Sequence, residues 1–380
     1  MKIAILYNTT EYLLRFRAEL IQSLQACGCD VVVISPLDKS TPRLKTLSVR
    51  YREWNLKGQS LNPFTDLAAI VDLSRILRDE RPDIVLNFTI KPVIYGSIVA
   101  GWLGVPRVVS MITGMGSIFL PSSFKGRLLL RAVHRLYRLA TNFNDKVIFQ
   151  NNEDLNYFVD KKFVHPDSTL RINGSGVNLN LFTPRQTETV RGSFLLISRM
   201  IKQKGIYEFV AAAREVRILF PHAKFTMVGP VDNNPEAISS EEIAGWERQG
   251  ILEYAGVQTD VRPFLERAEV YVLPTYYLEG IPRSILEALA MAKPVITSDW
   301  RGCRETVVPA VNGYLVPPQD TAALVQAMTR YLDDPALSKL HGDASRRLAE
   351  DKFDVHDVNR QIISALINHH SSRNGDDEIS

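Results

Sequence analysis

The stretch VYVLPTYYLEGIPRSILEALAMAKPVIT, residues 270–297, contains one complete unit of the pattern that decides the fold. An apolar run at 269–273 leads into a polar loop, then into a segment with apolar residues at helical spacing, and then into a second apolar run at 294–298. Continuous apolar runs separated by amphipathic segments are typical of parallel strands that helices cover on both faces. The stretch therefore predicts a β-α-β unit of a parallel sheet.

The same alternation continues along the chain in both directions. It predicts strands at 2–7, 30–35, 49–54, 83–88, 107–111 and 146–150 in the first half, and at 193–198, 223–229, 251–255, 269–273, 294–298 and 314–316 in the second. Helical spacing is found at 11–27 and 65–80, and again near 321–333, 335–350 and 354–369. We therefore predict an α/β protein with two Rossmann-like, doubly wound domains.

The linker between the two series of strands is expected at residues 176–192, which are polar and contain Pro184. We predict an N-terminal domain over 1–180, a C-terminal domain over 181–353, a helix at 354–370 that packs back toward the N-terminal domain, and a disordered tail at 371–380. Two such domains leave a cleft between the carboxyl ends of their strands, where open α/β sheets bind ligands.

Composition and charge narrow the class of protein. The 380 residues are 45% hydrophobic and 23% charged, as in a soluble globular protein. Residues 1–180 carry 23 Lys and Arg against 15 Asp and Glu, a net charge of +8, and the remainder carries 22 against 27, a net charge of −5. The first half therefore suits an anionic partner, such as a membrane surface or a phosphorylated molecule. No nucleic-acid-binding motif is visible, so we expect no nucleic-acid partner.

The compartment is also predicted from the sequence. Residues 2–7 form a buried strand rather than a signal peptide, and the apolar stretch 92–106 is short and interrupted by glycines, unlike a membrane span. Three scattered cysteines are typical of a reducing compartment, and the scattered histidines predict no metal site. We expect a cytoplasmic protein.

The segment EGIPRSILEA, residues 279–288, joins the strand at 269–273 to a helix. Free N–H groups at a helix N-terminus attract phosphate and other anions. Glu279 lies in the loop and Glu287 about two turns into the helix, so both carboxylates can face one small ligand and accept hydrogen bonds from sugar or ribose hydroxyls. The alternative is a helix-capping acid and a separate surface acid.

Segment 279–288 resembles the E-x7-E motif of retaining glycosyltransferases of family 4, which have the GT-B fold, two Rossmann-like domains facing across a cleft. The resemblance implies that Glu279 contacts the donor sugar and Glu287 the ribose. SRMIKQKG, residues 198–205, resembles the loop whose Arg and Lys hold the donor diphosphate, which implies that role for Arg199 and Lys204. The further donor-binding residues implied are Gly256, Val257, Gly280, Ile281 and Pro282.

The chemistry of a departing diphosphate supports the roles of Arg199 and Lys204. Negative charge builds up as the glycosidic bond breaks, and fixed cations stabilise that charge more in the transition state than in the ground state. The alternative is an exposed basic loop. No Asp-x-Asp pair, which a bridging divalent ion would use, occurs in the chain. We therefore expect a metal-independent reaction without a cofactor.

The N-terminal half departs from the commoner family pattern. Residues 7–10 replace a Gly-rich loop, and no histidine precedes His134, so Thr113 falls where a family histidine would lie. We assign no side-chain base, because in a retaining front-face mechanism a donor phosphate oxygen can accept the proton. Gly114 and Gly116 would allow a close backbone approach to donor or acceptor, or they form a tight turn only. The residues expected to line the acceptor side of the cleft are Asn8, Thr9, Thr113, Gly114 and Gly116.

Asn8, Thr9, the turn at 60–64 and the segment GMGS at 114–117 resemble a narrower group. These are bacterial transferases that extend sugars on undecaprenyl diphosphate for O-antigen, capsule or protein-linked glycans. The resemblance implies a UDP-sugar donor and a lipid-linked sugar acceptor.

The segment 124–140 predicts a basic amphipathic helix. Its cationic residues are Lys125, Arg127, Arg131, Arg135 and Arg138, and its apolar stripe is Leu129, Val133, Leu136 and Ala140. Such a helix is typical of a membrane surface element, which the +8 charge of this half favours. The alternatives are a core-packed helix with a solvated basic face, or a site for the acceptor's diphosphate.

The whole sequence predicts a retaining transferase that moves a hexose or N-acetylhexosamine from a UDP-sugar to a sugar on undecaprenyl diphosphate, at the inner face of the plasma membrane. Two alternatives stay open: a non-catalytic subunit that binds a nucleotide sugar or serves as a scaffold, and a UDP-sugar epimerase with the GT-B architecture.

Overall fold

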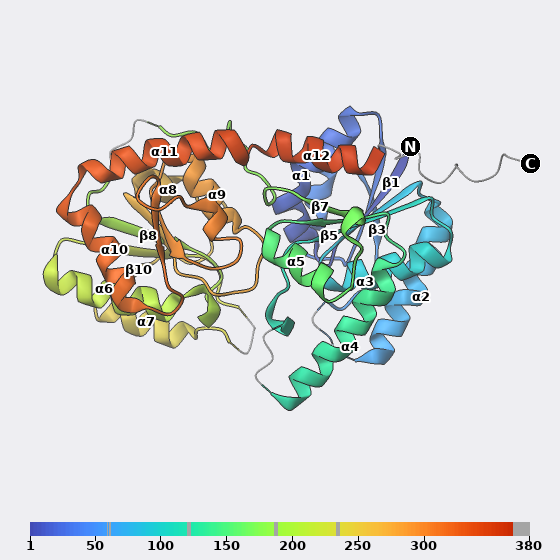
Figure 1. The fold of residues 1–380 in the computed structure, drawn as a ribbon, viewed down its shortest axis with the longest axis horizontal. Helices are drawn as coiled ribbons and strands as arrows, with labels where there is room; N and C mark the ends of the chain where they lie inside the picture. The colour runs from blue at the N-terminus through green and yellow to red at the C-terminus, as the bar shows by residue number, and fades with distance from the viewer. Residues whose placement is uncertain (59, 61, 120–122, 186–188, 233–235, 368–380) are drawn as a thin grey trace, which may run out of the picture.

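Two parallel sheets, each covered by helices on both faces, lie side by side along the long axis of the molecule (Figure 1). The computed structural model describes residues 1–367 apart from 59, 61, 120–122, 186–188 and 233–235. The predicted α/β class and doubly wound architecture are confirmed.

The first sheet has the strand order β3-β2-β1-β4-β5-β6-β7. Its strands are β1 (Lys2–Leu6), β2 (Asp30–Ser35), β3 (Arg50–Glu53), β4 (Ile84–Phe88), β5 (Arg107–Ile112), β6 (Lys146–Phe149) and β7 (Thr169–Arg171). Six of the seven lie where the alternation predicts them. The pattern does not predict β7, because its three residues contain one apolar side chain and are only partly buried. The order reverses between β1 and β4, which makes that pair the topological switch point of the sheet.

Helices of the first domain divide between the two faces of this sheet. One face packs against α2 (Pro63–Glu80), α3 (Ile90–Trp102), α4 (Phe124–Thr141) and α5 (Asn152–Asp160), and the other against α1 (Thr10–Ala26). The apolar stretch at 92–106 forms most of α3, which contacts α2 and α4 and is largely buried. None of the helices in the described ranges has the length and apolarity that crossing a bilayer requires.

The second sheet has the strand order β10-β9-β8-β11-β12-β13 and its own hydrophobic core. Its strands are β8 (Ser193–Ile197), β9 (Lys224–Val228), β10 (Glu253–Tyr254), β11 (Val270–Leu273), β12 (Val295–Ser298) and β13 (Gly313–Val316). Its helices are α6 (Ile206–Leu219), α7 (Ser240–Arg248), α8 (Arg262–Arg267), α9 (Arg283–Ala290), α10 (Thr321–Asp333) and α11 (Ala336–Lys352). The 3-10 helices within the described residues are η1 (Thr41–Leu47), η2 (Ser117–Phe119), η3 (Pro166–Ser168), η4 (Lys202–Lys204) and η5 (Arg304–Thr306). All six strands that the sequence predicts here are present.

The chain then returns to the first domain through α12 (Val355–Ile367), which lies against α1 (Figure 1). Val358, Ile362 and Leu366 of this helix are buried in one core with Leu20 and Ile21 of α1. Burying an aliphatic side chain of this size contributes about 1.5–3 kcal/mol. The first domain is therefore completed by residues that follow the second. The predicted disordered tail at 371–380 lies outside the described residues.

Candidate active site

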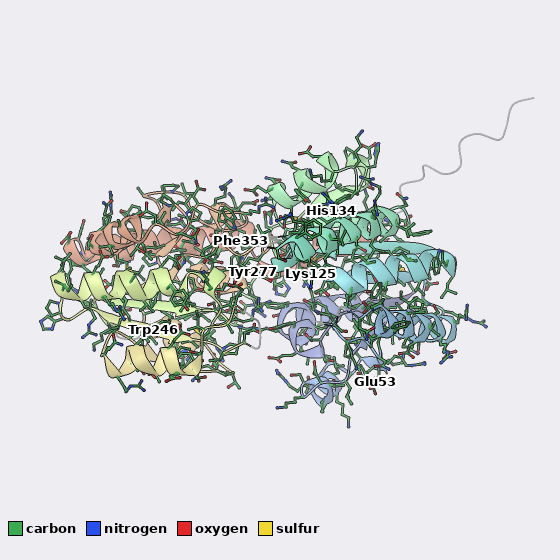
Figure 2. All side chains as sticks on the ribbon, turned by 90° about the horizontal axis from the view of Figure 1, so that it is seen from below. Glu53, Lys125, His134, Trp246, Tyr277 and Phe353 are labelled. Carbon is green, nitrogen blue, oxygen red and sulfur yellow. The ribbon has the colours of Figure 1, made fainter. Side chains whose placement is uncertain are left out.

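A cleft with a volume of about 520 Å³ lies between the two domains. Loops at the carboxyl ends of both sheets line it, as expected for open α/β sheets. Tyr277, which Figure 2 labels where the domains meet, is among its lining residues. Further lining residues include Asn8, Thr89 and Gly114 of the first domain and Arg199, Lys204 and Glu279 of the second.

Arg199, Lys204 and Glu279 lie together in this cleft. Arg199 follows β8 and donates from NH1 to Oδ2 of Asp232 at 2.7 Å. Lys204, only 7% exposed, forms an ion pair with Glu279. Its Nζ lies 5.6 Å from the ring centroid of Tyr277, and Cζ of Arg199 lies 5.5 Å from it. The two predicted diphosphate-binding cations and the predicted sugar-binding carboxylate therefore share one wall of the cleft.

The loop that carries Glu279 is held by the first domain. The N–H of Gly280 donates to the carbonyl of Thr113 at 3.1 Å, and the N–H of Gly116 donates to the carbonyl of Leu278 at 2.7 Å. Gly114 has a φ of +125°, a backbone conformation that residues other than glycine rarely adopt. The close approach expected of this glycine segment is therefore made to the Glu279 loop.

Glu287 is placed differently from Glu279. It is 4% exposed, and its Oε1 accepts a hydrogen bond from Nε of Arg283 at 3.2 Å. Burial raises the pKa of Glu287, although the Arg283 guanidinium opposes this shift. Arg283, rather than Glu287, lines the cleft, and its NH2 lies 3.9 Å from Oε1 of Glu19 in α1. The two carboxylates of the motif therefore do not face the cleft side by side.

The remaining predicted residues divide into those that line the cleft and those that do not. Thr9 does not line it; its hydroxyl caps α1 by accepting from the N–H of Tyr12 at 3.2 Å. Gly256 does not line the cleft either, although the next residue, Val257, does; the carbonyl of Gly256 accepts from the N–H of Gly229 at 2.8 Å. Predicted residues that do line the cleft are Asn8, Thr113, Gly114, Gly116, Val257, Gly280, Ile281 and Pro282.

Sequence reasoning missed several residues that line the cleft. Arg17 occupies an inward position of α1, in register with Leu13, Leu20 and Leu24. A charged residue within the apolar stripe of a helix is a signal that could have identified it. Thr89, which follows β4, and Arg283, at the start of α9, both sit at strand or helix ends where sheets of this class bind ligands.

The predicted basic residues of α4 lie outside the cleft and are exposed. The predicted apolar stripe is wrong at one position: Leu136 is 38% exposed, and Tyr137 takes the core position beside Val133 and Ala140. The outer side of the helix also carries Phe124, Leu128 and Leu139, which are 72%, 59% and 45% exposed. Figure 2 labels Lys125 at the start of this helix and His134 further along it. We call the following set the α4 surface: Phe124, Lys125, Arg127, Leu128, Arg131, Arg135, Leu136, Arg138 and Leu139.

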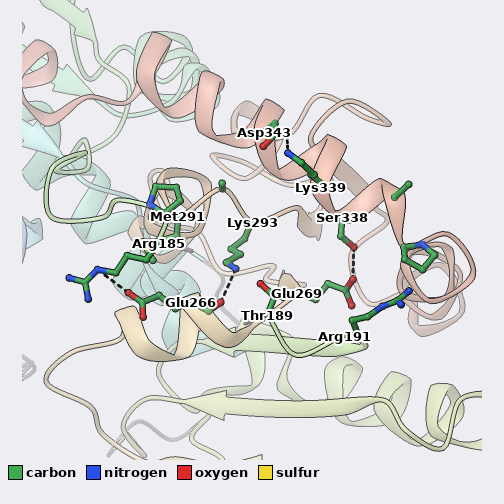
Figure 3. Close-up of a pocket in the computed structure, with 14 residues that line it drawn as sticks. Arg185, Thr189, Arg191, Glu266, Glu269, Met291, Lys293, Ser338, Lys339 and Asp343 are labelled. Atoms are coloured by element: carbon green, nitrogen blue, oxygen red, sulfur yellow. Dashed lines mark hydrogen bonds and ion pairs between the residues drawn. The ribbon is translucent and has the colours of Figure 1, made fainter. Parts of the chain in front are cut away.

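A second cavity, of about 730 Å³, lies elsewhere in the C-terminal domain (Figure 3). Arg191, Glu269 and Lys293 in its wall lie one or two residues before β8, β11 and β12, so it opens at the amino ends of the strands. Several of its polar groups already have partners: Nζ of Lys293 donates to the carbonyl of Glu266 at 3.0 Å, and Ser338 donates to Glu269 at 2.8 Å. Its position and internal pairing make it a poorer candidate than the cleft.

Comparison with known proteins identifies the family. The model described as glycosyl transferase 4-like matches residues 2–151, and the model described as glycosyl transferases group 1 matches residues 191–334. Each covers most of one domain, and together they span most of the chain. This chain belongs to the glycosyltransferases. The predicted enzyme class and family resemblance are thereby confirmed.

Curated relatives and solved structures are similar to this glycosyltransferase over most of its length. N,N'-diacetylbacillosaminyl-diphospho-undecaprenol alpha-1,3-N-acetylgalactosaminyltransferase of Campylobacter jejuni is 28% identical, over 92% of this chain and 94% of the relative. UDP-Gal:alpha-D-GlcNAc-diphosphoundecaprenol alpha-1,3-galactosyltransferase of Escherichia coli is 26% identical, over 74% of each chain.

Solved structures confirm the GT-B fold of this glycosyltransferase. The Anabaena protein Alr3699/HepE, solved with UDP-glucose, superposes with a TM-score of 0.80 at 18% identity, over 96% of this chain and 98% of that one. A glycosyltransferase from Rickettsia africae gives a TM-score of 0.77 at 20% identity, over 96% and 97% of the two chains.

Proposed function

We propose that this glycosyltransferase takes a hexose or N-acetylhexosamine from a UDP-sugar and transfers it, with retention, to a sugar on undecaprenyl diphosphate. One observation carries the donor assignment: Lys204 and Arg199 lie beside Glu279 in the cleft of a chain whose family transfers sugars. The cations suit the diphosphate of the donor, and the carboxylate suits the hydroxyls of its sugar.

The proposed reaction needs no side-chain base. The bond from the anomeric carbon to the diphosphate oxygen breaks, and a bond from that carbon to the acceptor oxygen forms on the same face. The proton of the acceptor hydroxyl moves to the departing phosphate oxygen, and Arg199 and Lys204 stabilise the charge that the diphosphate gains. In support, no histidine is among the described residues that line the cleft. We propose that these cations act in place of a divalent ion.

The acceptor and the nucleotide are proposed from the relatives. The Campylobacter jejuni and Escherichia coli enzymes are both named for acceptors linked to diphosphoundecaprenol, and the second for a UDP-sugar donor. This chain covers 94% and 74% of those relatives, so the likeness includes both domains of the first. The two relatives are named for different transferred sugars, N-acetylgalactosamine and galactose, and we leave the donor sugar open.

Such an acceptor is embedded in a membrane, and the α4 surface suits contact with anionic lipid at the cytoplasmic face. Its exposed arginines and its exposed Phe124 and Leu128 belong to one helix of the domain with the +8 charge. Basic residues near an anionic surface contribute about 1 kcal/mol each, and apolar side chains add affinity by inserting among the lipids. We propose peripheral attachment through this surface.

A donor screen tests the proposed function. Purified protein is incubated with UDP-, GDP- and ADP-sugars, with and without an undecaprenyl-diphosphate-linked monosaccharide, and released nucleotide and glycolipid product are measured. We expect UDP release that requires the acceptor and persists in excess EDTA. An epimerase would convert a UDP-sugar without releasing UDP, and a non-catalytic subunit would bind a UDP-sugar without turnover. Either result, or activity lost in EDTA and restored by manganese, would contradict the corresponding part of the proposal.

A further inference from the structure

The switch point of the first sheet places two polar residues next to each other in the cleft. In the parallel pair β1 and β4, Leu6 is paired with Asn87. The rings of the next two residues, Tyr7 and Phe88, stack with centroids 5.4 Å apart. Asn8 and Thr89 come next along the two strands, and both line the cleft. Ligands of doubly wound sheets bind at this position.

Arg17 of α1 lies over the same point. Its Cζ is 4.7 Å from the ring centroid of Phe88, and its NH2 contacts the sulfur of Met111 at 3.2 Å. The residue is 2% exposed, yet it belongs to the wall of the cleft. Its Nε and NH1 are buried and have no hydrogen-bond partner among the described residues. Two donors of a buried guanidinium are therefore available to a ligand.

The electrostatic surroundings of Arg17 favour an anionic ligand. Burial lowers the pKa of Arg17 to about 10, so the group stays charged at neutral pH. Burial raises the pKa of Tyr7 to about 12, so that neighbour stays neutral. Glu19 attracts the guanidinium but is not hydrogen-bonded to its free nitrogens, and Arg283 repels it. A buried cation without a paired carboxylate costs stability unless an anion binds to it.

Thr89 and Asn8 add uncharged groups to this point. Oγ1 of Thr89 and Oδ1 of Asn8 are buried and have no hydrogen-bond partner among the described residues. The Thr89 hydroxyl can donate to a phosphoryl oxygen, and the Asn8 amide can donate through Nδ2 after a 180° flip that exchanges Nδ2 with Oδ1. Thr89 also has a φ of +68° and a ψ of 164°, a region that residues other than glycine seldom occupy. It directly precedes α3, and its side chain makes no capping hydrogen bond. Ile90 and Lys91 in the first turn of that helix also line the cleft, and the first N–H groups of a helix favour an anionic ligand.

We propose that Asn8, Arg17 and Thr89 form a phosphoryl-binding subsite at the switch point of β1 and β4, and that it holds the diphosphate of the lipid-linked acceptor. This assignment rests on the proposed function. The donor diphosphate has its own cations, Arg199 and Lys204, on the opposite wall of the cleft. Under the proposed function the acceptor is the second substrate that brings phosphoryl groups to the cleft, because its diphosphate is attached directly to the sugar that receives the new residue.

The test measures binding of farnesyl diphosphate by calorimetry while UDP saturates the donor site, with farnesol as the phosphate-free control ligand. Arg17→Met removes the charge with little change in volume and is expected to preserve or raise the melting temperature. It should weaken farnesyl diphosphate binding by about 10-fold or more and change UDP affinity by less than about twofold. Thr89→Val should weaken the same ligand by a smaller factor.

Arg15→Met is the matched control, because Arg15 lies on the same helix and lines the cleft but is exposed. Its effect on farnesyl diphosphate should stay below about twofold, since exposed charges are screened by solvent. The proposal is overturned if the native chain does not bind farnesyl diphosphate, if Arg17→Met weakens UDP instead, or if the two arginine variants behave alike. Failure of the proposed function would appear separately, as no UDP release by the native chain in the donor screen.

Discussion

Gly114 of the first domain lies directly against Glu279 of the second: a Cβ atom at position 114 would be 2.6 Å from Cα of Glu279. The hydrogen bonds from Gly280 to Thr113 and from Gly116 to Leu278 flank this contact. The position of Glu279 relative to the acceptor half of the cleft therefore depends on a residue without a side chain.

Gly114→Ala is expected to displace the Glu279 loop and to lower kcat by at least about tenfold, since small displacements of reacting groups reduce rates steeply. Steady-state UDP release at saturating substrate measures this effect. Gly104→Ala is the matched control, because Gly104 also has a positive φ, +67°, but a Cβ there would meet nothing within 4 Å. It should lose a similar amount of stability and keep its kcat. Equal losses of kcat in both variants would show that the Glu279 contact is not responsible.

Lys204→Ala is expected to lower kcat by about 10²–10³, because a fixed charge at the departing diphosphate is lost. Circular dichroism should show an intact fold. Lys202→Ala removes an exposed lysine from the same loop, η4, and should leave kcat within about twofold. Near-normal turnover of Lys204→Ala would remove this residue from the mechanism.

Asp154→Asn is expected to stabilise the protein more at pH 7 than at pH 4.5. Burial raises the pKa of Asp154 to about 6. A hydrogen bond from Asn151, in the same domain, and the charge of Arg301, in the second domain, oppose this shift. The native state therefore holds the proton more tightly than the unfolded chain. The contribution of Asp154 to the free energy of unfolding falls as the pH rises from the unfolded-state pKa through the native pKa of about 6. An asparagine does not titrate, so the stability difference should grow by about 2 kcal/mol over that range. Chemical denaturation at both pH values measures it, and a constant difference would refute the assignment.

Arg131→Glu combined with Arg135→Glu is expected to weaken sedimentation with phosphatidylglycerol vesicles by at least about tenfold, because the α4 surface loses its attraction for anionic lipid. Arg214→Glu combined with Arg248→Glu makes the same charge change on exposed positions of α6 and α7 and should leave sedimentation unchanged. If both pairs release the protein equally, net charge rather than the α4 surface determines binding.

Local patterns in the sequence were sufficient for most of the fold. Strands such as β1 and β4 are continuous apolar runs, and these can be recognised without any knowledge of what they pack against. The strand β7 could not be recognised, because its short, polar sequence becomes a strand only through pairing with β6. On α4, helical spacing alone did not distinguish Leu136 from Tyr137, because long-range packing decides which one is buried. The ring of Tyr137 contacts the rings of Phe119 and Phe158, which lie in other parts of the chain.

The candidate site shows the same division. Arg199, Lys204 and Glu279 occur in local segments with a recognisable spacing, so the sequence placed them in one site. Arg17 and Thr89 have no such segment in common. They meet only because β1 and β4 are neighbours in the sheet, although 77 residues, 7–83, lie between the two strands in the chain. Contacts of this kind depend on the order of the strands in the sheet, which local patterns in a single sequence do not reveal.

Because α12 packs into the first domain, it determines the order in which the two domains can complete their folding during synthesis. The hydrophobic surface of α1 that receives Val358, Ile362 and Leu366 stays uncovered until those residues have left the exit tunnel. Domains usually fold in the order of their synthesis, but here the first domain must wait for the whole of the second. A stop codon anywhere before residue 355 would therefore damage the half of the enzyme that had been translated first.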